Sequence, residues 1–209
     1  FLGIRSTQSN ALLPETISDV RDYKTSAYEL KYTYQELTPQ NLLFPLSNAL
    51  EFRLSKSNRK TIDTKTNQIA YFLKASKIFN LNRKNSFYLR LQVQGIDSEN
   101  YLLNELIRFG GINSIRGFEE NSINATNLGV LASEYRYQLS SSLYIHSVID
   151  AAYFETPTQS NQKLYGFGFG FGLLTEAGLL RFNLANGKTE EQNFKFSDSK
   201  IHLSLTATF

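Results

Sequence analysis

The residues best placed to do chemistry lie in the glycine-rich segment 109–118, which reads FGGINSIRGF. Gly110 and Gly111 permit backbone angles that other residues avoid, and Gly117 directly follows the one arginine of the segment, Arg116. Such a segment can fold into a tight finger that holds the guanidinium of Arg116 in one place. A guanidinium binds carboxylates through paired, charge-assisted hydrogen bonds, so we expect its partners to be acidic residues on nearby elements.

Composition excludes several other kinds of chemistry. The 209-residue chain has no cysteine, so neither a disulfide framework nor a thiolate metal site is available. His146 and His202 lie far apart without metal-ligand spacing around them, and we expect no metal site and no cofactor. A formal net charge of +3, without a basic stripe, is too small to favour nucleic acid as a partner. No Ser/His/Asp arrangement lies near an oxyanion-type turn, so we expect a protein that is not an enzyme.

The elements that must position the arginine segment are β-strands. Apolar residues recur at every second position through most of the chain, whereas helical periodicity is almost absent. No run approaches the roughly 20 continuous apolar residues that a membrane helix requires. A weak first strand begins at Phe1, and nine clearer strands are predicted at 26–35, 50–55, 68–74, 87–94, 131–139, 143–153, 165–172, 180–184 and 201–209.

Strand lengths and loop lengths predict an all-β fold, an antiparallel transmembrane β-barrel. About ten strands of roughly 8–12 residues have the length that a tilted strand needs to cross a bilayer. Tight turns on one side of the membrane and long loops on the other are typical of outer-membrane barrels. The alternative is a soluble all-β domain, because a mean hydropathy of −0.31 is typical of soluble proteins. A barrel needs only one apolar face per strand, however, so the average is compatible with both. Long polar connections are predicted at 8–23, 57–66, 96–126, 155–161 and 186–198, and short ones at 80–85, 140–141 and 176–178.

The order of short motifs resembles the BamA/TamA superfamily of outer-membrane assembly and translocation barrels. The segment GGINSIRGF lies in a long loop, at about 97–126, with five strands before it and five after it. A GxLRF motif at 178–182 and an alternating last strand that ends on an aromatic residue follow in the same order. The loop contributes Gly110, Gly111, Ile115, Arg116, Gly117 and Phe118 to the resemblance, and the last strand contributes Ile201, Leu203, Leu205 and Phe209.

The resemblance implies that residues 1–209 form the C-terminal part of a sixteen-stranded barrel, of which about ten strands are present. The chain opens at Phe1 without a methionine or a signal-peptide pattern, so we expect further strands, an export signal and any POTRA domains upstream. The last strand would carry the signal by which bacterial outer-membrane proteins reach their assembly machine. Phe209 could equally be an interfacial anchor, and the two roles are compatible.

In this family the loop arginine inserts into the barrel lumen and pairs with acidic residues on the two following strands. The resemblance gives Arg116 that role, with Glu134 and Asp150 as its partners. Alternation along the two strands independently turns both carboxylates toward the polar lumen. The alternative is three separate charges solvated by pore water. Ala152 stands where the family often has glycine, and the glycines of 165–172 are expected to keep one lumen wall low so that the loop can lie against it.

Two mechanisms follow from the resemblance. In the first, a weakly paired seam beside strand 199–209 opens sideways and templates incoming outer-membrane proteins through backbone hydrogen bonds, although this strand lacks the glycine at which family members often kink. In the second, the barrel is a secretion pore and the arginine loop is its plug. A third interpretation is a membrane anchor for an upstream lipase-like domain. Outside the family stands a passive diffusion pore, which a pinned loop disfavours.

The resemblance also implies a location and partners. The expected location is the bacterial outer membrane. The expected partners are the lipid bilayer, unfolded outer-membrane protein clients, and accessory lipoproteins or periplasmic proteins.

Overall fold

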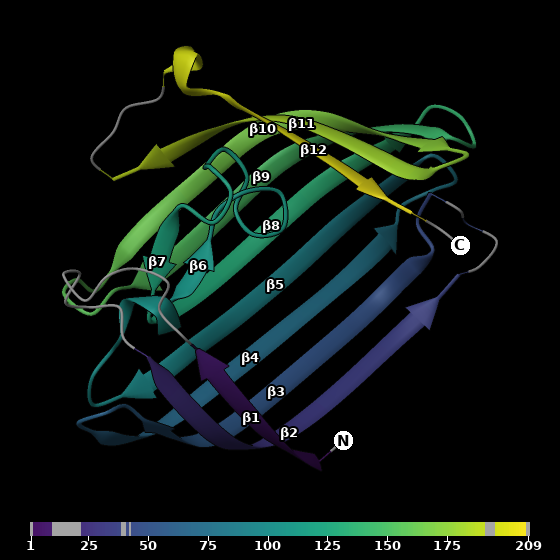
Figure 1. Ribbon diagram of the computed structural model, residues 1–209. Helices are drawn as coiled ribbons and strands as arrows, with labels where there is room; N and C mark the ends of the chain where they lie inside the picture. Colours follow the sequence, from purple (N-terminus) through teal and green to yellow (C-terminus); the bar gives the residue numbers. More distant parts are fainter. Residues whose placement is uncertain (1, 10–21, 39–40, 42, 191–194, 208–209) are drawn as a thin grey trace.

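Of the 209 residues, the computed structural model describes residues 2–9, 22–38, 41, 43–190 and 195–207. Ten strands form one antiparallel sheet that curves into part of a barrel (Figure 1). Every strand of this sheet pairs with its neighbours in the chain, apart from the step between β5 and β8, which a long loop connects. The strands are β1 (Leu2–Ser9), β2 (Tyr23–Leu37), β3 (Leu46–Lys60), β4 (Lys65–Asn80), β5 (Asn85–Ser98), β8 (Asn127–Gln138), β9 (Leu143–Glu155), β10 (Gln162–Thr175), β11 (Gly178–Thr189) and β12 (Lys200–Thr206).

The sheet is open along two edges. Within the described part of the chain, β1 pairs only with β2, and β12 pairs only with β11. Five strands precede the long loop and five follow it, so the predicted fold class and the predicted position of the loop among the strands are confirmed. The antiparallel order explains why a short turn suffices between β3 and β4, β4 and β5, β8 and β9, and β10 and β11.

The predicted alternation of faces is present in the sheet. Large apolar side chains lie on the convex face and stay exposed, as Phe169 (62%) and Leu203 (64%) show. The polar side chains that alternate with them point into the hollow of the sheet, where Glu134 and Asp150 are buried. An exposed apolar face of this extent is the surface that lipid covers in a barrel. No helix among the described residues is long and apolar enough to cross a membrane.

One predicted long loop is wrong. Residues 57–66 do not form a long connection, because β3 continues to Lys60 and β4 begins at Lys65. The hairpin keeps its backbone pairing beyond the apolar band, where both faces are polar and the alternation disappears. The short connections predicted near 80–85 and 176–178 are present. Most of the loop predicted at 8–23 and part of that at 186–198 lie outside the described residues.

The loop between β5 and β8 has structure of its own. It contains a short 3₁₀ turn, η1 (Leu103–Glu105), and a two-stranded stem of β6 (Ile107–Phe109) and β7 (Ile123–Ala125). A second short turn, η2 (Phe196–Asp198), precedes β12. Figure 1 shows the β6–β7 stem and its looped tip on the inner side of the curved sheet. The stem therefore delivers residues 110–122 into the hollow of the barrel.

Candidate functional site

The tip of the loop is a tight turn fixed by its own backbone. Gly110 and Gly111 have φ values of +116° and +90°, which L side chains rarely adopt. The Gly110 N–H donates to the Ser114 hydroxyl at 2.6 Å, and the Gly111 N–H donates to the Ile115 carbonyl at 3.0 Å. These bonds satisfy backbone groups inside a buried segment, so the residues before Arg116 are held in one conformation.

Arg116, Glu134 and Asp150 lie together inside the sheet. The guanidinium donates to Asp150 twice, from Nε to Oδ2 at 2.8 Å and from Nη2 to Oδ1 at 2.6 Å. Its third nitrogen, Nη1, binds the carboxylate of Glu134. The backbone N–H of Arg116 adds a fourth bond, to Asp150 Oδ2 at 3.0 Å. Two acids on neighbouring strands thus hold the arginine by its fork and by its main chain.

The charged side chains of Arg116, Glu134 and Asp150 are almost completely shielded from solvent. The side chains of Arg116 and Asp150 are 4% and 0% exposed, so the attraction between them is little screened by solvent. Burial lowers the pKa of the Arg116 guanidinium, but the hydrogen bonds with Asp150 and the charge of Glu134 raise it above its ordinary value. The two carboxylates therefore favour the charged form of Arg116.

Arg136, on the same strand as Glu134, completes the charge balance. It donates from Nε to Glu134 Oε2 at 2.7 Å, so this carboxylate is shared between two arginines. Its guanidinium also stacks against aromatic rings, 4.2 Å from the ring centre of Tyr88 and 4.9 Å from that of Phe44. These contacts fix the orientation of Glu134 from the side opposite to Arg116.

Two glycines admit the loop to the wall of the barrel. A Cβ added at Gly166 of β10 would overlap the carbonyl oxygen of Arg116. Gly117, with φ of +91°, packs so closely on β11 that a Cβ there would lie 2.5 Å from the Gly187 nitrogen. The expected low wall is therefore present at Gly166. Its neighbours Gly168 and Gly170 instead make room for β11 and for side chains of the wall itself.

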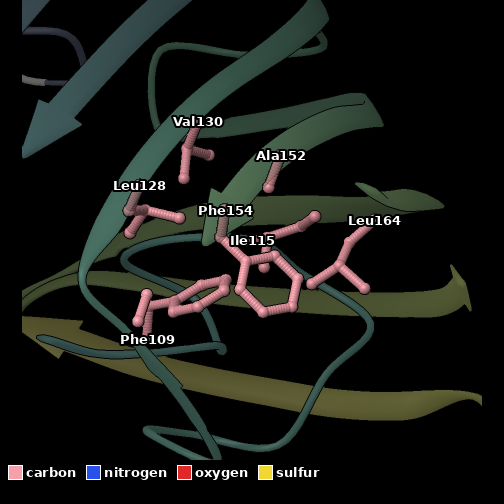
Figure 2. Packing of buried hydrophobic residues seen from close by; sticks show 8 residues of the cluster. Phe109, Ile115, Leu128, Val130, Ala152, Phe154 and Leu164 are labelled. Carbon is pink, nitrogen blue, oxygen red and sulfur yellow. The ribbon is translucent and has the colours of Figure 1, made fainter. Parts of the chain in front are cut away.

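An apolar cluster inside the lumen packs the loop onto the sheet (Figure 2). Ile115, which precedes the arginine, is completely buried in it, and Phe118 packs against its margin. Phe109 of the stem meets Phe154 of β9 edge to face, with ring centres 5.2 Å apart. Ala152 belongs to this cluster, so the position where the family often has glycine is filled by a methyl group. The buried members are Phe109, Ile115, Ala125, Leu128, Val130, Ala152, Phe154 and Leu164.

Sequence reasoning missed several residues that hold the loop. Arg90 of β5 donates to the carbonyls of Asn113 and Ser114 at 2.5 and 2.6 Å. His202 of β12 accepts a hydrogen bond from the Gly117 N–H at its Nε2, at 3.0 Å. The inward position of both could be inferred from alternation. Their partners are backbone groups, however, and a backbone group has no sequence signature.

Further polar contacts hold the tip and the base of the loop. Glu119 pairs with Lys200 of β12 at 2.8 Å. At the base of the loop, Glu105 of η1 forms a buried ion pair with Arg59 of β3 and accepts from Gln68 of β4 at 3.2 Å. The loop is thus bonded to strands toward both edges of the sheet, β3 and β4 at one and β12 at the other.

The residues predicted for the last strand lie on its outer face. Ile201, Leu203 and Leu205 of β12 are 63%, 64% and 58% exposed. Phe209 lies outside the described residues, so its predicted roles stay predictions.

The contacts of the site bind and position the loop. In the part of the chain that the structure describes, no three His, Cys, Asp or Glu side chains gather as metal ligands. His146 instead shares a hydrogen bond with Asn183 at 2.7 Å. Each carboxylate of the arginine site is already occupied by cationic donors. This arrangement suits a structural clasp.

Comparisons with known proteins agree with this fold. The Omp85 superfamily domain matches residues 49–205. Among solved structures, CdiB from Acinetobacter baumannii is similar, with a TM-score of 0.56 and 17% sequence identity over 80% of this chain. The chain spans 30% of that structure. No curated protein matches the sequence. With the family match extending over most of its length, the chain belongs to the Omp85 superfamily.

Proposed function

We propose that this chain is part of an outer-membrane barrel that assists the insertion and assembly of other outer-membrane proteins through a lateral seam at β12. The observation that carries the proposal is the loop held inside the barrel. Buried ion pairs and an apolar cluster fix it against β8, β9 and β10. A lumen occupied in this way leaves the sheet edge as the place where a client strand can be received.

The edge of β12 has the chemistry that strand addition requires. β12 is seven residues long, and all seven pair with β11, whereas its other edge has no partner among the described residues. In the proposed full-length barrel this edge lies at the seam, and where its pairing is weak it presents N–H and C=O groups that an incoming strand can bind. This role uses backbone hydrogen bonds and needs no catalytic group. The proposed partners are the lipid bilayer, unfolded clients, and accessory lipoproteins or periplasmic proteins.

The test combines depletion with two proline variants. Depleting the full-length protein should lower the amounts of other outer-membrane proteins, measured by quantitative mass spectrometry of outer membranes. Alternate residues of an antiparallel strand direct their N–H groups to opposite sides. Of Leu203→Pro and Ser204→Pro, one therefore removes a donor toward β11 and the other a donor at the seam edge.

The two variants should separate. The variant that keeps the wild-type melting temperature should fail to restore client levels, because only its weakly paired seam edge is altered. Unchanged client levels after depletion, or full rescue by that variant, would show that the seam does not template clients.

A second candidate function is a polypeptide-translocating pore of the same superfamily. The observation that favours it is the two-stranded stem, which makes the loop a separate element attached to the sheet by its ends and inserted as a plug. Planar-bilayer recording on the full-length protein distinguishes the two. A pore should show a current that increases in Arg116→Ala, because this change raises the population of the released loop, whereas a seam insertase should stay closed.

A further inference from the structure

A cavity beside the loop tip is lined by three cationic side chains that form no direct ion pair with any carboxylate among the described residues. It has a volume of about 260 Å³ and is lined by residues of β2, β3, β4, β5, β8 and β11 and by the tip residues Ile112 and Asn113. Lys74, Arg90 and Arg181 contribute their charges to it. Since a water molecule occupies about 30 Å³ in the liquid, this space holds a small solute with several waters.

The three cations are unpaired within the part of the chain that the structure describes. Lys74 and Arg181 make no hydrogen bond or ion pair there, and the Nε of Arg181 is buried without a partner. Arg90 is buried, and its two terminal nitrogens donate to carbonyl groups and not to a carboxylate. Its Nε has no hydrogen-bond partner. Three like charges around one cavity repel each other and lose hydration.

The carboxylates nearby are already taken. Glu134 lines the cavity but is shared by Arg116 and Arg136. Glu51 also lines it, and this acid pairs with Arg53 at 3.3 Å and with Lys31 at 3.7 Å. Each available acid therefore has two cations of its own, and the excess positive charge needs an anion from elsewhere.

We propose that this cavity is an anion-binding site, which takes an oxyanion of the carboxylate or phosphate class. The guanidinium of Arg181 offers a fork that fits two oxygens, and Lys74 of another strand adds a point charge. Hydroxyl groups of Thr33 and Ser76 line the same space as further donors. A bound anion would bridge β4, β5 and β11 against the loop tip, so it would stabilise the closed position of the loop. The inference does not rest on the proposed function, because it concerns binding alone.

The test is thermal unfolding of the full-length protein in detergent at constant ionic strength. Sodium chloride is replaced stepwise by sodium phosphate in one arm, and an acetylated tetraglutamate peptide is added in a second arm. A ligand that binds only the folded state raises the melting temperature by an amount that grows with its concentration. We expect a rise of several degrees, in the phosphate arm if free phosphate is the ligand class and in the peptide arm if side-chain carboxylates are.

Variants connect the shift to the cavity. Lys74→Gln/Arg181→Gln should abolish it and should melt at a higher temperature than wild type in chloride, because the repulsion is relieved. Arg83→Gln/Lys188→Gln removes the same charges from exposed positions and should keep the wild-type shift. If the double cavity variant does not fold, Lys74→Gln alone should halve the shift or more.

Two results would overturn the proposal. One is a wild-type protein whose melting temperature is the same in chloride, phosphate and peptide. The other is an equal shift in wild type and in the cavity variants, which identifies screening at the surface as its cause.

Discussion

Replacing Arg116 with alanine tests the clasp inside the barrel most directly. The change removes three side-chain hydrogen bonds and leaves the buried carboxylate of Asp150 without a cation. Breaking a buried ion pair by removing one partner costs about 3–5 kcal/mol. The lower end applies here, because Glu134 keeps Arg136 and Asp150 keeps the backbone N–H at position 116. A loss of about 3 kcal/mol raises the population of the released loop about 150-fold.

Hydrogen exchange measures that population. In the full-length protein, the amides of Gly111 and Ser114 are bonded within the loop tip and exchange only when the tip opens. Their exchange should accelerate by about 150-fold in Arg116→Ala, as expected from the loss of free energy. Arg116→Lys keeps the charge but not the fork, so its effect should be intermediate.

Arg108→Ala is the matched control. This arginine is exposed on β6 of the same loop, and its replacement should leave the exchange of the tip unchanged. The reasoning is refuted if the tip amides of Arg116→Ala exchange at the wild-type rate while the protein is fully folded.

The remaining predictions concern the contacts around the clasp. Gly166→Ala should lower the melting temperature and cost about 1–3 kcal/mol of stability, because its methyl group would overlap the Arg116 carbonyl. Gly129→Ala should be neutral, because the atom nearest to an added Cβ there lies 4.0 Å away. His202→Ala leaves the buried Gly117 N–H without an acceptor and should speed hydrogen exchange of that amide. The loss of stability should be about 1–3 kcal/mol. The hydrogen bond from Lys200, and then its charge, lower the pKa of Glu119 from 4.5, so this contact stabilises the loop above that pH and is lost as the pH falls through the lowered pKa. Glu119→Gln should therefore loosen the tip slightly at pH 7 and not at about pH 2, in the same exchange assay.

The strands could be predicted from the sequence where one face meets lipid. Period two in 165–172 and 201–206 reflects a physical requirement, because each outward side chain must be apolar. The ends of strands could not be predicted in the same way. β3 extends to Lys60 although 57–60 is polar throughout, since backbone pairing continues where the apolar requirement stops.

Parts of the arginine site were also within reach of sequence reasoning. Arg116, Glu134 and Asp150 were predicted from a family resemblance together with alternation, and the structure places them in contact. The supporting contacts depend on the exact path of the loop. Arg90 binds carbonyl groups 23 and 24 residues away, and His202 binds an amide 85 residues away. Only a folded loop defines such partners.

The apolar cluster under the loop also determines how the barrel behaves after it has been opened. If the tip withdraws, the apolar side chains of Leu128, Val130, Phe154 and Leu164 become exposed to water in the lumen. Each Å² of such surface exposed to water costs about 25 cal/mol. Exposure of this apolar surface therefore favours the return of the tip, unless another apolar chain covers the same side chains.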